Sequence, residues 1–148
     1  MRNLCLILTF CTLNAAAQSD EAAVKATVTR LFEGMRQSDT AMLRSAFAPT
    51  AILQTIAKNK SGEVQVRTDA VADFVASVGK PHTEVYDERI TFDKVLIDGD
   101  LASVWTPYKF YVGQKFSHCG VNSFQLVRIA GEWKVQYIID TRRREGCE

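Results

Sequence analysis

The sequence predicts an α+β domain, with helices in the first half of the chain and antiparallel strands in the second. Apolar residues recur at helical spacing from Val24 to Met35, which predicts an amphipathic helix. From His82 onward, apolar and polar residues alternate between glycine-containing turns, a pattern typical of strands. With 148 residues, 47% of them hydrophobic, the chain is long enough to form one domain with a substantial core.

The N-terminus has the pattern of a secretory signal peptide. Arg2 supplies a positive charge, an apolar stretch runs from Leu4 to Leu13, and the small residues Ala15 and Ala17 fit a signal-peptidase site. We therefore predict a signal peptide over residues 1–17 and a single domain over residues 18–148, exported to the periplasm or secreted. Acylation at Cys11 is a less favoured alternative, because Phe10 stands where a small residue is needed.

Charge gives no indication of a polyanionic partner. Removing residues 1–17 takes away Arg2 and no acid, so the remaining chain has 17 basic and 17 acidic residues. This balance favours neither nucleic acid nor an anionic membrane. No later stretch approaches the roughly 20 apolar residues that a membrane span needs. We therefore expect no nucleic-acid partner and no membrane insertion after removal of the signal peptide.

The cysteines and histidines do not form a metal motif. After loss of the signal peptide only Cys119 and Cys147 remain, and in an oxidising compartment they could pair and close a loop of about 28 residues. The alternative is a buried strand thiol and a free terminal thiol. Taken together, the two cysteines and the two histidines, His82 and His118, are spread too far apart in sequence to make a recognised zinc-binding spacing. We expect no metal and no cofactor.

The first half of the chain should contain three helices and a pair of short strands. Ser19 can cap the first helix, Ser38 or Asp39 a second short one, and Thr68 or Asp69 a third. Between the second and third helices, β-branched residues flank a turn that contains Gly62. The strands expected there are 51–57 and 63–67.

Four long strands should follow. The first, 83–97, changes register part-way, which predicts a bulge near Asp93. Pro107 marks a second irregularity, because proline cannot donate a hydrogen bond to a neighbouring strand. Turns are expected at Gly99, Gly113 and Gly131.

Two segments carry a resemblance to a known superfamily. The tail FQLVRIAGEWKVQYIIDTRR, with its Gly131–Lys134 and Asp140–Arg142 motifs, resembles the C-terminal hairpin of exported bacterial lumazine-binding-like proteins. The AFAPTA segment at residues 46–51 resembles the same family's junction between second helix and first strand. Together with the element order, they identify the chain as similar to the nuclear transport factor 2-like, or cone fold, superfamily.

That resemblance implies a specific architecture. Three helices should pack in the concave side of a strongly bent, mostly antiparallel sheet that ends in four long strands. It also implies a cavity between sheet and helices and a homodimer formed through the outer sheet face. The superfamily includes isomerases, dehydratases, cyclases and non-catalytic domains, so membership alone implies no reaction.

Strand register predicts which polar residues face this cavity. A three-residue turn at 113–115 would pair Val112 with Phe116, and counting outward pairs Phe110 with His118 and Thr106 with Asn122. The same count pairs Tyr108 with Gly120 and Val104 with Phe124, so all of these residues share one face. That face is apolar enough to be the inner wall.

The expected ligand contacts are polar or aromatic residues of the strands. We predict Trp105, Tyr108, His118, Asn122 and Tyr137 to be ligand-binding, whereas Asp140 and Arg142 should lie at the rim or in an interface. His118 is the candidate general acid or base, since a histidine in a half-apolar pocket can titrate near neutrality. No acid is expected on the inner face of the long strands, which disfavours carboxylate-based isomerase chemistry.

Three functions are compatible with these residues. The first is binding of a small apolar or aromatic molecule in the cavity. The second is a lyase or isomerase that uses His118. The third is a non-catalytic interaction module whose cavity is filled by core side chains.

Overall fold

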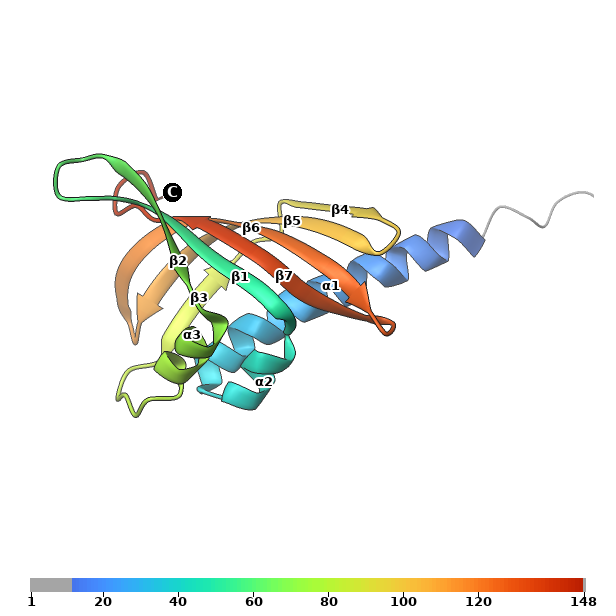
Figure 1. Ribbon diagram of the computed structural model, residues 1–148, viewed down its shortest axis with the longest axis horizontal. Helices are drawn as coiled ribbons and strands as arrows, with labels where there is room; N and C mark the ends of the chain where they lie inside the picture. Colours follow the sequence, from blue (N-terminus) through green and yellow to red (C-terminus); the bar gives the residue numbers. More distant parts are fainter. Residues whose placement is uncertain (1–11, 148) are drawn as a thin grey trace, which may run out of the picture.

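The computed structural model describes residues 12–147 and confirms the α+β cone fold. Three helices lie against one side of a curved, unclosed sheet (Figure 1). The helices are α1 (Thr12–Gln37), α2 (Thr40–Ser45) and α3 (Val71–Val78). The strands are β1 (Phe47–Lys58), β2 (Val64–Asp69), β3 (Tyr86–Ile90), β4 (Lys94–Asp98), β5 (Leu101–Val112), β6 (Lys115–Ile129) and β7 (Glu132–Thr141). The first eleven residues of the predicted signal peptide lie outside the described part.

The sheet is antiparallel except at one junction. Its strand order is β2-β1-β7-β6-β5-β3, and β4 also pairs with β5. The β1–β7 pair is parallel, and between these two neighbours the chain passes from β2 at one edge of the sheet to β3 at the other. The core lies between α1 and the concave face, where Val28, Leu43, Phe124 and Leu126 are fully buried.

The helices follow the predicted patterns with shifted starts. Val24, Val28, Leu31 and Met35 of α1 are buried as the helical spacing predicts. The helix begins at Thr12, so Ser19 lies within it rather than at a cap. Asp39 caps α2, because its Oδ1 accepts hydrogen bonds from the backbone N–H groups of Ala41 at 3.0 Å and Met42 at 2.9 Å. The N-cap of α3 is Ala70, one residue after the predicted Asp69.

The first of the four predicted long strands is interrupted rather than bulged. It consists of β3 and β4, which both pair with β5. Between them, the N–H groups of Thr91 and Asp93 donate to the carbonyls of Pro107 and Trp105, both at 3.0 Å. The interruption therefore lies opposite Pro107, as expected where a strand lacks a donor.

The β5–β6 register agrees with the prediction over most of its length. Phe110 pairs with His118, Tyr108 with Gly120 and Thr106 with Asn122. The predicted Val112–Phe116 pair is wrong, because a bulge near the turn pairs Val112 with Lys115 instead. The error stays local, since the bulge ends before His118.

A second bulge, in β7, exchanges the two faces of that strand. Leu126 pairs with Val135, but the preceding residue Gln125 pairs with Tyr137, so Gln136 has no partner on β6. Trp133 and Val135 are buried before the bulge, and Asp140 is buried after it. The inward face therefore changes from odd to even residue numbers, because side chains alternate with a period of two.

The end of the chain is attached to β6 by backbone pairing and a disulfide. The N–H groups of Cys119 and Arg143 each donate to the other residue's carbonyl at 2.9 Å. Cys119 also forms a disulfide with Cys147, which selects the first of the two alternatives predicted for these cysteines. The residues that follow β7 are thus held beside the middle of the sheet.

We expect the disulfide to stabilise the fold by roughly 3–4 kcal/mol, the value that loop-closure entropy gives for a loop of this length. Reduction should lower the free energy of unfolding by this amount in urea denaturation. A Cys147→Ala variant should have the lower stability already and should not respond to reductant. If peptide mapping by mass spectrometry found no linked Cys119–Cys147 peptide in the untreated protein, the pairing would be wrong.

Candidate functional site

The site is a cavity of about 460 Å³ between the helices and the concave face of the sheet. Most of its wall is apolar, with side chains from α1, α3 and the central strands. These are Leu31, Phe32, Met35, Leu53, Phe74, Val78, Phe110, Phe124 and Ile138. A volume in this range suits a small organic ligand, and the wall would bury the ligand's apolar body.

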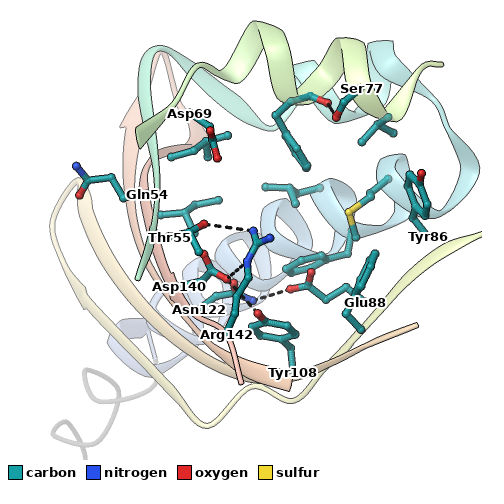
Figure 2. A pocket seen from close by; sticks show the side chains of 18 of the residues that line it. Gln54, Thr55, Asp69, Ser77, Tyr86, Glu88, Tyr108, Asn122, Asp140 and Arg142 are labelled. Atoms are coloured by element: carbon teal, nitrogen blue, oxygen red, sulfur yellow. Dashed lines mark hydrogen bonds and ion pairs between the residues drawn. The ribbon is translucent and has the colours of Figure 1, made fainter. Parts of the chain in front are cut away.

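One polar cluster on the sheet side joins β1, β5 and the end of β7. The Tyr108 hydroxyl lies 3.0 Å from Asp140 Oδ2, to which it donates, and 3.0 Å from the Thr141 carbonyl. Arg142 Nε donates to the same Asp140 oxygen at 3.0 Å, and its Nη2 donates to Thr55 Oγ1 at 3.2 Å. Figure 2 shows these side chains gathered at one end of the cavity.

The charges in this cluster stabilise one another. Burial and the negative charge of Asp140 raise the pKa of Tyr108, so its hydroxyl keeps the proton that it donates. Burial opposes the charge of Arg142, but Asp140 more than offsets this, and the pKa of Arg142 is raised. Asp140, only 7% exposed, is therefore compensated by two donors.

A second polar cluster is centred on Glu88 of β3. Asn122 Nδ2 donates to Glu88 Oε1 at 2.9 Å and lies 3.4 Å from Thr106 Oγ1. Burial raises the pKa of Glu88 to about 7, and the nearby negative charge of Asp140 adds to this. The Asn122 hydrogen bond opposes the shift without cancelling it. Glu88 can therefore exchange a proton near neutral pH.

His118 lines the same cavity between two aromatic rings. Its ring centroid is 5.7 Å from that of Tyr108 and 5.0 Å from that of Phe110. His118 Nδ1 lies 3.0 Å from Ser117 Oγ. Burial lowers the pKa of His118 and the positive charge of Arg142 lowers it further, so the neutral imidazole is favoured near pH 7.

Comparison with known proteins identifies the family. A family model described as "Putative lumazine-binding" matches residues 19–136. The chain belongs to this family. No functionally curated protein matches the sequence.

Solved structures agree with the nuclear transport factor 2-like fold of this lumazine-binding-like chain. A conserved protein from Planctomyces limnophilus has a TM-score of 0.70 and 18% identity over 85% of this chain and 98% of its own. An NTF-2 like protein of unknown function from Silicibacter pomeroyi has a TM-score of 0.68 and 18% identity, covering 86% of this chain and 98% of its own. A "putative dehydratase" of the NTF2-like family from Streptomyces avermitilis has a TM-score of 0.65 and 17% identity over 86% and 98%.

The structure brings together three of the five residues predicted to contact a ligand. Tyr108, His118 and Asn122 line the cavity. Trp105 does not, since it is 45% exposed on the outer face of β5 beside a shallow surface hollow. Tyr137 is directed away from the cavity by the β7 bulge, and its hydroxyl donates to Gln54 Oε1 at 2.6 Å. The predictions for Trp105 and Tyr137 as cavity residues are wrong.

Asp140 and Arg142 were predicted for the rim or an interface. That placement is wrong for Asp140, whose side chain is buried, whereas Arg142 lines the cavity with a side chain that is 46% exposed, which agrees with a rim position. Both line the cavity and belong to its polar cluster. The prediction assumed a regular β7, whereas the unpaired Gln136 turns the even-numbered residues inward. A single inserted residue therefore decides whether the cavity contains an ion pair.

Glu88 was not among the residues predicted from the sequence, and because it lines the cavity, the expectation of no acid on the inner face is wrong. Tyr86 and Ile90 form an apolar face of the strand, and Glu88 lies between them at the same two-residue spacing. That position was the available signal, because a carboxyl on the buried face of a strand is unusual.

The described residues show neither a metal cluster nor a spanning helix. Within residues 12–147, no group of three or more His, Cys, Asp and Glu side chains is arranged to hold an ion. None of the helices in that range is long and apolar enough to cross a membrane.

The raised pKa of Glu88 predicts a stability change with pH. The unfolded chain releases the Glu88 proton near pH 4.5 and the folded chain near pH 7. The protonated carboxyl therefore contributes its full share of the free energy of unfolding below pH 4.5, and this contribution is lost as pH rises to 7. Glu88→Gln should match the wild type at pH 4 and exceed its stability at pH 8 by roughly 1–3 kcal/mol in urea denaturation. The exposed Glu145→Gln is the control, and a pH-independent difference for Glu88→Gln would contradict the assignment.

Proposed function

We propose that this chain is an exported domain that binds a small, mostly apolar molecule in the cavity between its helices and sheet. The observation that carries this proposal is the cavity itself, which is about 460 Å³ and combines an apolar wall with polar groups at one end. Arg142, Glu88, Asn122 and His118 are the polar side chains available to orient a ligand. Small-molecule sites commonly combine these two kinds of surface.

The cavity also argues against the filled-core alternative. One water molecule takes about 30 Å³ of liquid volume, so the cavity is far larger than a packing defect. Charged groups such as Glu88 and Asp140 would be costly to bury in a purely structural interior. Contact with a ligand would explain why charged residues occupy these positions, whereas packing alone would not.

Export and dimerisation are parts of the same proposal. The signal-like N-terminus and the Cys119–Cys147 disulfide both favour an oxidising compartment. Leu96 and Trp105 are exposed on β4 and β5, where an outer-face homodimer would cover them. Fractionation of the native host tests the first part, and sedimentation equilibrium of the purified protein tests the second.

We expect native mass spectrometry of protein purified from its own host to detect a bound small molecule. Ile138→Trp fills the cavity from β7 and should remove the extra mass, whereas Ile139→Trp on the opposite face of the strand should retain it. Circular dichroism and thermal unfolding of both variants check that each is folded. An extra mass that persists in folded Ile138→Trp would contradict binding in this cavity.

Lumazine is the first compound to test, because the family description names it. Wild type and Ile138→Trp are each titrated into lumazine while the lumazine fluorescence is monitored. A difference in affinity between the two proteins shows whether lumazine occupies the cavity. Equal affinity for both proteins would exclude lumazine as a cavity ligand without excluding other molecules.

A lyase or isomerase is the second candidate. It is favoured by two groups on the wall of one cavity: Glu88, whose pKa is raised to about 7 by burial, and the neutral imidazole of His118, which can accept a proton. One structural neighbour is also described as a "putative dehydratase". For an enolisable carbonyl compound that the protein turns over, His118→Ala should abolish turnover while the circular dichroism spectrum is unchanged. Full turnover by folded His118→Ala would exclude His118 as the catalytic base.

A further inference from the structure

The charged groups of the cavity are unequal in number. Its wall contains four carboxyl groups and two guanidinium groups, and each guanidinium already has a carboxylate partner. Arg67 Nη2 lies 3.1 Å from Asp69 Oδ2, and Arg142 Nε lies 3.0 Å from Asp140 Oδ2. Within residues 12–147, Asp73 and Glu88 are the cavity carboxyls that have no ion-pair partner. The unbalanced charge is therefore negative.

Of these two carboxyls, Glu88 is the less exposed. Asp73 is exposed on α3, whereas Glu88 is half-buried on β3, where it lines the cavity. Asn122 donates to Oε1 of Glu88, and no group in the described part of the chain donates to Oε2. Figure 2 shows the carboxyl directed toward Asn122 and the polar end of the cavity. One acceptor oxygen thus remains available to a ligand.

Aromatic rings surround this carboxyl. Phe110 is its cross-strand partner on β5, and Tyr86 precedes it by two residues on the same face of β3. The Tyr86 and Phe110 centroids are 6.1 Å apart. Phe32 and Phe124 meet edge to face on the cavity wall, also at 6.1 Å. A carboxylate among aromatic rings is a suitable environment for an ammonium group, which interacts favourably with both.

We propose that the cavity's ligand is a protonated amine with an apolar body, whose ammonium group donates to Oε2 of Glu88. The proposal rests on the proposed binding function and specifies its ligand class. The aromatic rings of Tyr86 and Phe110 contact the cation, and the apolar wall from α1 and α3 buries the rest of the molecule.

The groups that face Glu88 favour an amine over a carboxylate ligand. The titratable side chains that line the cavity with Glu88 come from several elements. They are Asp140 on β7, Tyr108 on β5, His118 on β6 and Asp73 on α3, while α1 contributes apolar side chains only. Arg142 is the cation that acts on Glu88, and its positive charge is partly neutralised by its ion pair with Asp140. A carboxylate ligand would meet more negative than positive charge unless Glu88 were protonated first.

The two ligand classes therefore respond to pH in opposite directions. Burial raises the pKa of Glu88 to about 7, and an ammonium group requires its ionised form. Affinity for an amine should rise as pH increases through 7, whereas affinity for a carboxylate should fall. An alkylamine stays protonated throughout this range, since its pKa is close to the value of about 10.4 for lysine.

The experiment compares 4-phenylbutylamine with its neutral isostere 4-phenylbutan-1-ol by isothermal titration calorimetry at pH 5.5 and 8.5. For wild type, the amine should bind at least tenfold more tightly at pH 8.5 than at pH 5.5, and the alcohol should show no such change. Glu88→Gln should lose about tenfold in amine affinity at pH 8.5 and bind the alcohol as the wild type does. Glu145→Gln, which makes the same chemical change on an exposed residue, should bind both probes as the wild type does.

Each other outcome has a defined meaning. Equal binding of amine and alcohol, unaffected by Glu88→Gln, overturns the amine assignment and leaves the cavity-binding function in place. Tighter binding of 4-phenylbutyrate at pH 5.5 than of the amine at pH 8.5 overturns it in favour of an anionic ligand. If wild type binds none of these probes, the amine assignment fails, and the mass spectrometry of the host-purified protein decides the binding function separately.

Discussion

The register between β6 and β7 is the constraint on which the cavity depends. One unpaired residue, Gln136, reverses the two faces of β7 beyond that point. Before it, Trp133 and Val135 complete the core, and after it Ile138 and Asp140 face the cavity. A regular strand would have placed Tyr137 and Ile139 inward, giving an uncharged wall. The bulge therefore converts a packed sheet into one that presents an ion pair.

The position of Arg142 depends on the same part of the sheet. Backbone pairing of Arg143 with Cys119 holds the chain just beyond β7 against β6. Gly120 makes this close approach possible, since a Cβ atom there would lie 1.8 Å from the Thr141 carbonyl oxygen. The Thr141 carbonyl in turn lies 3.0 Å from the Tyr108 hydroxyl. The backbone contacts that attach the C-terminus thus also align the polar cluster of the cavity.

Much of the fold could be predicted from the sequence because its signals are local. Helical spacing identified the buried face of α1, and alternation around Gly113 gave the pairing of Tyr108, His118 and Asn122. The cap of α2 was narrowed to Ser38 or Asp39, of which Asp39 is the one observed. The site was less predictable. A bulge adds a residue without any distinctive side chain, so the inward turn of Asp140 could not be inferred from alternation. Glu88 was missed because the charge of a residue normally indicates an exposed position.

The two polar clusters of the cavity draw their members from distant parts of the chain, which has a consequence for the order of folding. Thr55 and Arg142 are separated by 87 residues, Glu88 and Asn122 by 34, and Tyr108 and Asp140 by 32. Contacts of such separation require the closure of long loops, so they form only when most of the sheet has assembled. A partly folded chain would have helices and hairpins but no complete cavity. Ligand binding would thus select the fully assembled molecule and shift the folding equilibrium toward it.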